Sequence, residues 1–411
     1  NNIEQSIIEL EYSLISNIRH LTKKNHSNKK NIGLITGHGE NTNSDYMLSF
    51  KNLLQQEQYN LTEIPPINGQ LNALQNIDCI IINNPTLFFS EKNKFVIDQF
   101  IMNGGKSIWI LSNSTATIDS LTSKSSMIAM PIENRNINDL LFKYGIRINN
   151  DIIQDLQCME IPIITHFIET EPQWDFRPWT FFPISNGNPN HVITENINPS
   201  KLEFPNSIDI IENEQVKPTI LLSTSHNTKA IPLPALIDLE NLNNQPNKKI
   251  FNEGKKNTAV LLSGVFESIF KNRIPLEIQK DSLINFQSNS KTNQMIIISD
   301  GEFITNDCDY DLSNCRPYPI GYDMFNDTQY GNNDFILNSI EYLMNIDSTE
   351  LYNEELLINV RSKKVDLRPI NNEKLKQNKT FWQLLNIILP ICVIIIFYFI
   401  IKLMRIIKYK N

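Results

Sequence analysis

The first third of the chain alternates short apolar runs with amphipathic stretches. Apolar residues at helical spacing favour helices at 44–56 and 90–105, the second bounded by Ser90 as an N-cap and by glycines at 104–105. Strands that alternate with helices usually pair in parallel, so we expect a first α/β domain at 31–130. Apolar runs typical of buried strands lie at 31–36, 61–64, 78–83 and 107–111.

Beyond residue 130 the pattern is less regular. Residues 155–215 are rich in proline, asparagine and aromatic side chains, so we expect an irregular insertion within a second α/β region at 131–345. Further buried strands and a last helix are predicted at 219–223, 259–262, 295–299 and 334–344. Together these elements predict an α/β fold with a mostly parallel, doubly wound sheet of Rossmann-like or amidotransferase-like type and an irregular second half.

The two ends of the chain differ from the α/β regions between them. An apolar stripe within residues 1–30 predicts an amphipathic helix, and residues 346–380 are polar and charged, as in a stalk. Residues 384–401 carry no charge, and at about 1.5 Å per residue they match the thickness of a bilayer core. We expect one C-terminal transmembrane helix there; the alternative is a buried core helix. Long domains translocate largely regardless of charge, so we favour a cytoplasmic tail at 402–411.

Composition narrows the possible partners. The chain has 411 residues and a formal net charge of -8, whereas nucleic-acid binders usually carry a basic surface, so we expect none. Cys308 and Cys315 lie in one polar loop, where they form either a disulfide in an oxidising compartment or two free thiols. The chain opens Asn1-Asn2-Ile3 without a methionine, so we expect it to be a fragment of a longer protein.

Two polar loops follow predicted strands and are candidate ligand sites. Parallel sheets bind ligands beyond the carboxyl ends of their strands. There, glycines let a ligand approach the backbone, while His and Glu bind polar groups or a metal. Asp300 and Glu302 could suit Mg²⁺ or Ca²⁺, although Asp-Gly is usually only a turn. For the first loop, Gly37 to Glu40, the alternative is likewise a tight turn with a satisfied polar pair. The candidate residues are Gly37, His38, Gly39, Glu40, Asp300, Gly301 and Glu302.

Four aromatic residues, Trp174, Trp179, Phe181 and Phe182, form a further candidate. Exposed together, they would make a binding patch. Packing in the core is the more common use of such side chains, and both alternatives stay open at this point.

The sequence offers no catalytic constellation. Ser112 to Thr115 follow a predicted strand, but no glycine flanks them as a nucleophile elbow requires. Cys79 and Cys158 lie in apolar or helical contexts, and no phosphate-binding P-loop pattern is present. We therefore expect no enzymatic activity, no cofactor and no resident metal.

Several segments coincide, in order, with one known family. The chain resembles the GldG family, gliding-motility-associated auxiliary subunits of ABC transporters in Bacteroidetes, often called substrate-binding-like. The segments that carry the resemblance are GHGE at 37–40, SEKNKFVIDQFIMNGGK at 90–106, LLFKYGIRIN at 140–149, DLQC at 155–158, FKNR at 270–273, SDGE at 299–302, GNNDFILNSIEYL at 331–343 and RSKK at 361–364.

The resemblance implies an inner-membrane protein whose main domain is periplasmic. Its implied partners are the transporter permease and, through it, the cytoplasmic ATPase. We therefore expect a non-enzymatic, membrane-anchored auxiliary subunit, associated with gliding motility and surface-protein export, that acts by protein docking. The alternatives are a periplasmic binding module for a sugar or peptidoglycan fragment, read near His38 and Glu40, and a degenerate amidotransferase-like hydrolase.

Overall fold

The structure is a computed structural model of the protein. It divides into two compact units, Ile7–Lys363 and Asn1–Ser6 with Lys364–Asn411, and the central sheet lies in the first of them. The residues that it describes are 29–40, 45–122, 124–168, 171–243, 246–275, 284–311 and 314–345, with the single positions 14, 358, 397, 398, 401, 402 and 404.

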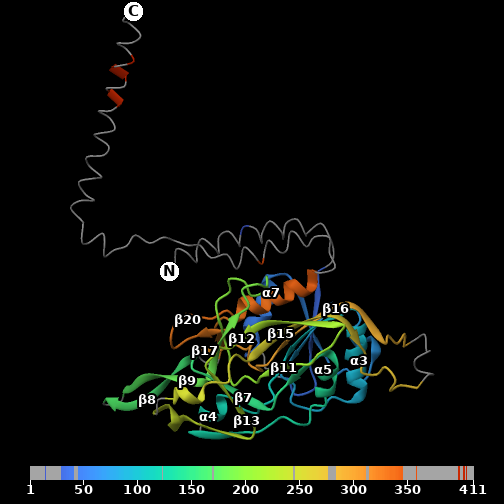
Figure 1. Ribbon diagram of the computed structural model, residues 1–411, viewed down its shortest axis with the longest axis horizontal. Helices are drawn as coiled ribbons and strands as arrows, with labels where there is room; N and C mark the ends of the chain where they lie inside the picture. Colours follow the sequence, from blue (N-terminus) through green and yellow to red (C-terminus); the bar gives the residue numbers. More distant parts are fainter. Residues whose placement is uncertain are drawn as a thin grey trace, which may run out of the picture. The chain divides into compact units, whose positions relative to one another are not determined.

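Ten described strands form a central sheet in the order β10-β9-β12-β15-β16-β4-β3-β1-β2, with β8 paired to β9 (Figure 1). Its strands are β1 (Asn31–Ile35), β2 (Asn60–Ile64), β3 (Cys79–Asn83), β4 (Lys106–Ile110), β8 (Cys158–Ile168), β9 (Glu171–Gly187), β10 (Ser200–Lys201), β12 (Val216–Ser223), β15 (Asn257–Glu267) and β16 (Asn289–Ile298). The described helices are α2 (Leu48–Gln56), α3 (Glu91–Met102), α4 (Asp119–Thr122), α5 (Asn138–Tyr144), α7 (Asn332–Asn345) and the 3-10 turns η1 (Leu71–Leu74), η2 (Leu239–Asn243) and η3 (Lys248–Ile250).

The sheet is mixed, so the prediction of a mostly parallel, doubly wound α/β fold is wrong. Parallel pairing joins β2, β1, β3, β4 and β16, whereas β16, β15, β12, β9 and β10 pair antiparallel. The apolar runs at 219–223, 259–262 and 295–299 are indeed buried strands, but burial does not encode direction. Direction depends on the connections, and only the first part of the chain has the helical crossovers that parallel neighbours require.

The expected irregular insertion at 155–215 is also wrong in its first half. There β8 and β9 form a long antiparallel hairpin, in which Glu160 faces Pro178 and Ile164 faces Trp174. The hairpin lies on the side of the molecule opposite to α3 and α5 (Figure 1). Prolines and asparagines suggested loops here, yet the β-branched and aromatic residues between them favour strands.

Helices cover the parallel strands on both faces. On one face, α3 and α5 pack on the sheet through residues such as Ile97, Ile101 and Leu140. On the other face, α2 and α7 pack through residues such as Phe50 and Ile340. Every residue of β3 and β4 is buried as a result, which explains the continuous apolar runs in the sequence. Ser90 accepts a hydrogen bond from the backbone N–H of Asn93 at 3.2 Å, so the predicted N-cap of α3 is confirmed.

A smaller lobe packs beside the antiparallel part of the sheet. Its core includes Ile152, Trp179, Phe181 and Ile237. The short antiparallel pairs are β5–β14, β6–β11, β7–β13, β17–β18 and β19–β20. Their strands are β5 (Ser126–Ala129), β6 (Ile146–Ile148), β7 (Asp151–Asp155), β11 (Ile208–Ile210), β13 (Thr228–Pro232), β14 (Ala235–Asp238), β17 (Cys308–Asp311), β18 (Asn314–Pro317), β19 (Tyr322–Asp323) and β20 (Thr328–Gln329).

The expected terminal elements fall mostly outside the described residues. Among the residues that are described, no helix is both long and apolar enough to cross a bilayer. Of the segment 384–401, only 397, 398 and 401 are described. The amphipathic helix within 1–30 and the stalk at 346–380 likewise lie almost wholly outside the described part, so both stay predictions.

Candidate functional site

The candidate ligand residues lie at one edge of the sheet, beyond the carboxyl ends of parallel strands. Gly37 to Glu40 follow β1, and Asp300 to Glu302 follow β16. In the sheet, β3 and β4 separate these two strands. At about 4.8 Å between neighbouring strands, the two motifs are roughly 14 Å apart. They therefore do not form one site, and the loop after β3 lies between them.

The first motif is a tight loop that packs against the chain on both sides. Gly37 and Gly39 have φ angles of 102° and 75°, which favour glycine. A Cβ at Gly37 would lie 2.7 Å from Pro66, so no larger residue fits there. The backbone oxygen of His38 accepts hydrogen bonds from the N–H groups of Thr86 and Leu87, at 2.9 and 2.7 Å. The glycines thus allow close contact with the protein's own chain.

His38 is buried and both of its ring nitrogens have partners. Nδ1 lies 3.1 Å from Oε1 of Glu40, and Nε2 lies 2.9 Å from the side-chain nitrogen of Asn93. The second carboxylate oxygen of Glu40 accepts the backbone N–H of His38 at 2.6 Å. The imidazole stacks on the Phe89 ring, with centroids 3.7 Å apart. This geometry fits the turn with a satisfied polar pair and leaves neither nitrogen directed at a ligand.

The second motif is held in a similar way. Asp300 is buried, and its two carboxylate oxygens accept the backbone N–H groups of Glu203 and Glu302, both at 2.9 Å. Burial raises the pKa of Asp300 well above its usual range. Burial, with help from the nearby charge of Glu203, raises the pKa of Glu302 to about 7. A Cβ at Gly301 would lie 2.3 Å from the side chain of Asn84, so this loop also packs tightly on its neighbour.

The segment Glu203–Ser207, which we call the rim plug, covers the ends of β4 and β16. Asn206 accepts the backbone N–H of Asn113 at 2.6 Å, and its own N–H donates to the backbone oxygen of Ser299 at 3.0 Å. It thereby joins the ends of β4 and β16. Open parallel sheets usually hold a ligand where the strand order reverses, which here is between β1 and β3. At that point the loop after β1 binds the loop after β3, since the backbone oxygen of His38 accepts the N–H groups of Thr86 and Leu87. Among the described residues, no group of three or more His, Cys, Asp or Glu side chains is arranged to hold a metal ion.

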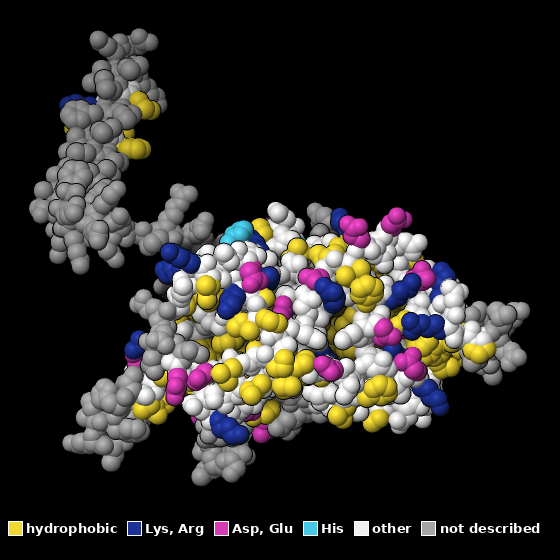
Figure 2. Space-filling view, turned by 60° about the horizontal axis from the view of Figure 1, so that its bottom comes forward, with side chains coloured by type: hydrophobic (Ala, Val, Ile, Leu, Met, Phe, Trp, Pro, Cys, Tyr) yellow, Lys and Arg dark blue, Asp and Glu magenta, His cyan; other side chains and the backbone are white. Residues whose placement is uncertain are grey.

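The four aromatic residues divide between core and surface. Trp179, Phe181 and Phe182 are buried in the core of the smaller lobe, whereas 53% of Trp174 is exposed on the β8–β9 hairpin. They do not form one patch. Hydrophobic side chains nevertheless spread across the face that lies at the bottom of Figure 1 and carries α4, β7 and β13 (Figure 2).

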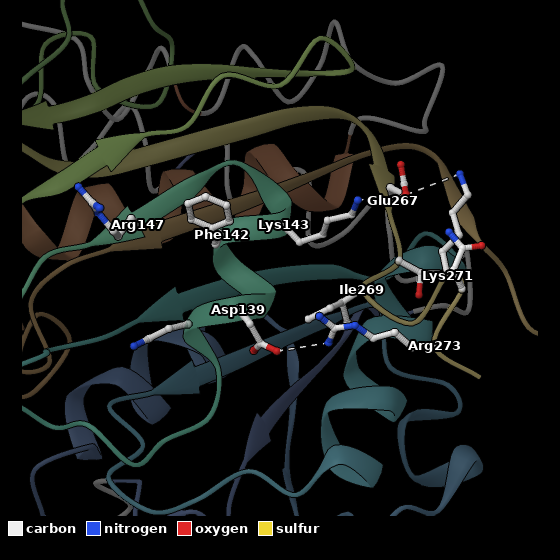
Figure 3. A pocket seen from close by; sticks show the side chains of 11 residues that line it. Asp139, Phe142, Lys143, Arg147, Glu267, Ile269, Lys271 and Arg273 are labelled. Carbon is white, nitrogen blue, oxygen red and sulfur yellow. Dashed lines mark hydrogen bonds and ion pairs between the residues drawn. The ribbon is translucent and has the colours of Figure 1, made fainter. Parts of the chain in front are cut away.

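Sequence reasoning missed a groove of about 590 Å³ between α5 and the loop 267–273 (Figure 3). We call it the α5 groove. Basic side chains from both elements line it, together with Phe142. Two segments that carry the family resemblance, LLFKYGIRIN and FKNR, supply much of its lining. Their exposed basic residues were a usable signal, but nothing in the sequence indicated that segments about 130 residues apart meet.

Replacing His38 by alanine is expected to destabilise the fold. The change leaves the buried Glu40 carboxylate without its imidazole partner and opens a cavity beside Phe89, so the free energy of unfolding should fall by about 2–4 kcal/mol. His226 is exposed, and His226→Ala should change it by less than about 0.5 kcal/mol. Chemical denaturation measures both values; equal stability of the two variants would contradict the structural role of His38.

Glu302 should give the stability a pH dependence. Its pKa is about 7 in the folded chain, above the ordinary 4.5, so the protonated form stabilises the fold. That contribution is complete below about pH 4.5 and is lost as the pH rises through about 7. Glu302→Gln should therefore gain about 2 kcal/mol over the unchanged protein between about pH 5 and pH 8. Denaturant titrations across this range give the difference, and parallel curves would exclude the effect.

The fold is weakly similar to several solved structures. The "mmIFT52 N-terminal domain" aligns with a TM-score of 0.42 and 12% identity, over 78% of this chain and 99% of that chain. A putative ThuA-like protein from Bacteroides uniformis aligns with a TM-score of 0.35 and 12% identity, over 78% and 93%. Another, from Parabacteroides merdae, aligns with a TM-score of 0.35 and 10% identity, over 78% and 92%.

No curated protein matches the sequence at a significant level. A family model does match, and it covers residues 29–339, which span the central sheet and the smaller lobe. The model describes an ABC-type uncharacterized transport system, and its members are auxiliary components of such systems. Because the match extends over most of the 411 residues, the chain belongs to this family of auxiliary components of ABC-type transport systems.

Proposed function

We propose that this auxiliary component is a non-enzymatic subunit that acts by docking to other proteins. The observation that carries the proposal is the rim plug. Asn206 and the buried Asp300 tie Glu203–Ser207 across the ends of β4 and β16. At the end of β1, both ring nitrogens of His38 are bound by side chains of the protein. Because the protein's own groups cover these strand ends, its outer surface remains for interactions with other proteins. This argues against the alternatives of a sugar-binding module or a hydrolase at that edge.

The nucleophilic side chains support a role without catalysis. Burial raises the pKa of the Cys79 thiol far above its usual range and that of Cys158 to about 12, so neither forms the reactive thiolate at neutral pH. Ser112 donates to the backbone oxygen of Ser114 at 3.1 Å, and Ser114 accepts the backbone N–H of Ala116 at 3.0 Å. These hydroxyl groups stabilise their own loop.

Exposed apolar pairs support docking. Ile128 on β5 faces Leu236 on β14, and the two side chains are 63% and 62% exposed. Ile164 faces Trp174 on the β8–β9 hairpin, and both are also exposed. Apolar side chains that lie opposite one another on open strands are typical of surfaces that a partner covers.

The proposal places the main domain, which contains the central sheet, in the periplasm, and anchors it to the inner membrane through residues 384–401. The disulfide between Cys308 and Cys315 supports an oxidising compartment. The charge-free run at 384–401 supports the anchor. The partners are the transporter permease, contacted through this helix and the body, and through it the cytoplasmic ATPase. The resemblance to GldG proteins extends the role to gliding motility and surface-protein export.

The anchor should contribute specific contacts. When residues 384–401 are replaced by an unrelated transmembrane helix of equal length, the chain should remain in the membrane, but recovery of the multi-pass permease by affinity purification should fall several-fold. Loss of Asn386 and Pro390 removes groups that suit helix–helix packing. Equal recovery would rule out specific packing, and no permease with the unchanged chain would rule out docking itself.

The redox state of Cys308 and Cys315 in cells tests the proposed periplasmic location. In acid-quenched intact cells Cys308 and Cys315 should resist a thiol-alkylating reagent until a reductant is added, since the periplasm keeps such pairs oxidised. The double change Cys308→Ser and Cys315→Ser should lower the free energy of unfolding by about 2 kcal/mol, as expected for a short closed loop. Free thiols at both positions in quenched cells would contradict the periplasmic location.

A further inference from the structure

The α5 groove has a rigid base built around one buried carboxylate. Asp98 of α3 accepts hydrogen bonds from the Tyr144 hydroxyl at 2.9 Å, the Ser268 hydroxyl at 2.6 Å and the Ile269 backbone N–H at 3.2 Å. These contacts tie α5 and the loop 267–273 to the same helix. Because both walls are anchored to α3, the groove is formed before any ligand arrives, which limits the entropic cost of binding.

The charges of the groove are unbalanced. Four cations, Lys143, Arg147, Lys271 and Arg273, line it with only two carboxylates, Asp139 and Glu267. Arg147 also pairs with Asp209, outside the lining, at 2.6 Å, so the four cations have three carboxylate neighbours in a chain whose net charge is -8. An excess of cations in a concave site attracts anionic partners.

Neither carboxylate makes its shortest ion pair with Lys271 or Arg273. Asp139 lies 2.8 Å from the buried Lys94, but 3.7 Å from Arg273. Glu267 lies 3.0 Å from Lys143, but 3.7 Å from Lys271. The positive ends of Arg273 and Lys271 are therefore held loosely, and 57% of the Arg273 side chain is exposed. Both can turn to an incoming carboxylate without breaking a short ion pair.

The arrangement favours an extended ligand over a small anion. Figure 3 shows Arg147 at one end of the groove and Lys271 at the other, with Phe142 and Lys143 between them. These cations are spread along the groove and do not converge on one point, as a single phosphate would require. Phe142 is 53% exposed and offers an apolar contact in the middle. An aromatic anchor flanked by cations suits a peptide with acidic and apolar side chains.

We propose that the α5 groove binds an acidic segment of a partner protein, with a large apolar side chain of that segment against Phe142. Carboxylates of the segment pair with Lys271 and Arg273, whose own ion pairs are long. The inference deepens the proposed docking function and rests on it, because it names one surface and the chemistry of its partner.

The test measures binding of a fluorescein-labelled, glutamate-rich peptide with a central Phe-Leu pair to the full chain in detergent, by fluorescence anisotropy. The double change Lys271→Glu and Arg273→Glu should weaken binding by at least about tenfold at low salt. Phe142→Ser, or a peptide with serines in place of Phe-Leu, should weaken it several-fold. The matched control, Lys248→Glu with Lys249→Glu on the exposed η3, makes the same change in net charge and should bind as before.

Each other outcome overturns the inference. If the η3 control weakens peptide binding equally, the loss of binding reflects only the net charge of the chain. Displacement of the peptide by inorganic phosphate at constant ionic strength would make the groove a small-anion site. Thermal unfolding of each variant excludes loss of the fold as the cause. If the permease co-purifies but the peptide does not bind, only the groove proposal fails; if the permease never co-purifies, the docking function fails.

Discussion

Burial of β3, β4 and the last four residues of β16 (295–298) on both faces is the constraint on which the other features depend. Polar groups at the ends of such strands have little access to water and need partners within the protein. Asn206 and Asp300 meet this need by binding backbone N–H groups of neighbouring loops. The rim plug therefore follows from the depth of the sheet, and the recognition that we propose lies on an outer surface, the α5 groove.

The sequence predicted the elements of the parallel part well, because each carries its own local signal. The run Cys79–Asn83 is continuously apolar, and α3 has a capping serine. The antiparallel half could not be predicted in the same way. Apolar residues at 259–262 and 295–299 report burial on both faces but not the direction of the strand, which depends on distant partners. The sheet topology therefore required the three-dimensional structure.

The two candidate loops follow strands β1 and β16, as the sequence indicates, and their role as ligand sites stays a prediction. Glycines around His38 marked a close approach, yet its partners Phe89 and Asn93 come from more than fifty positions later in the chain, where no motif points back to it. The aromatic residues show the same limit. Trp174 is exposed and Trp179 is buried on one strand, and composition alone cannot assign neighbouring rings to opposite environments.

The pairing of β4 with β16 has a consequence for how the chain is made. Ser107 lies opposite Met295, so almost two hundred residues separate the two halves of this contact. Until β16 has been synthesised, β4 is an open edge with unpaired backbone groups and a tryptophan, the kind of edge that recruits other chains. Contacts this distant in sequence also form slowly. Under the proposed periplasmic location, translocation before folding keeps this edge from meeting other copies.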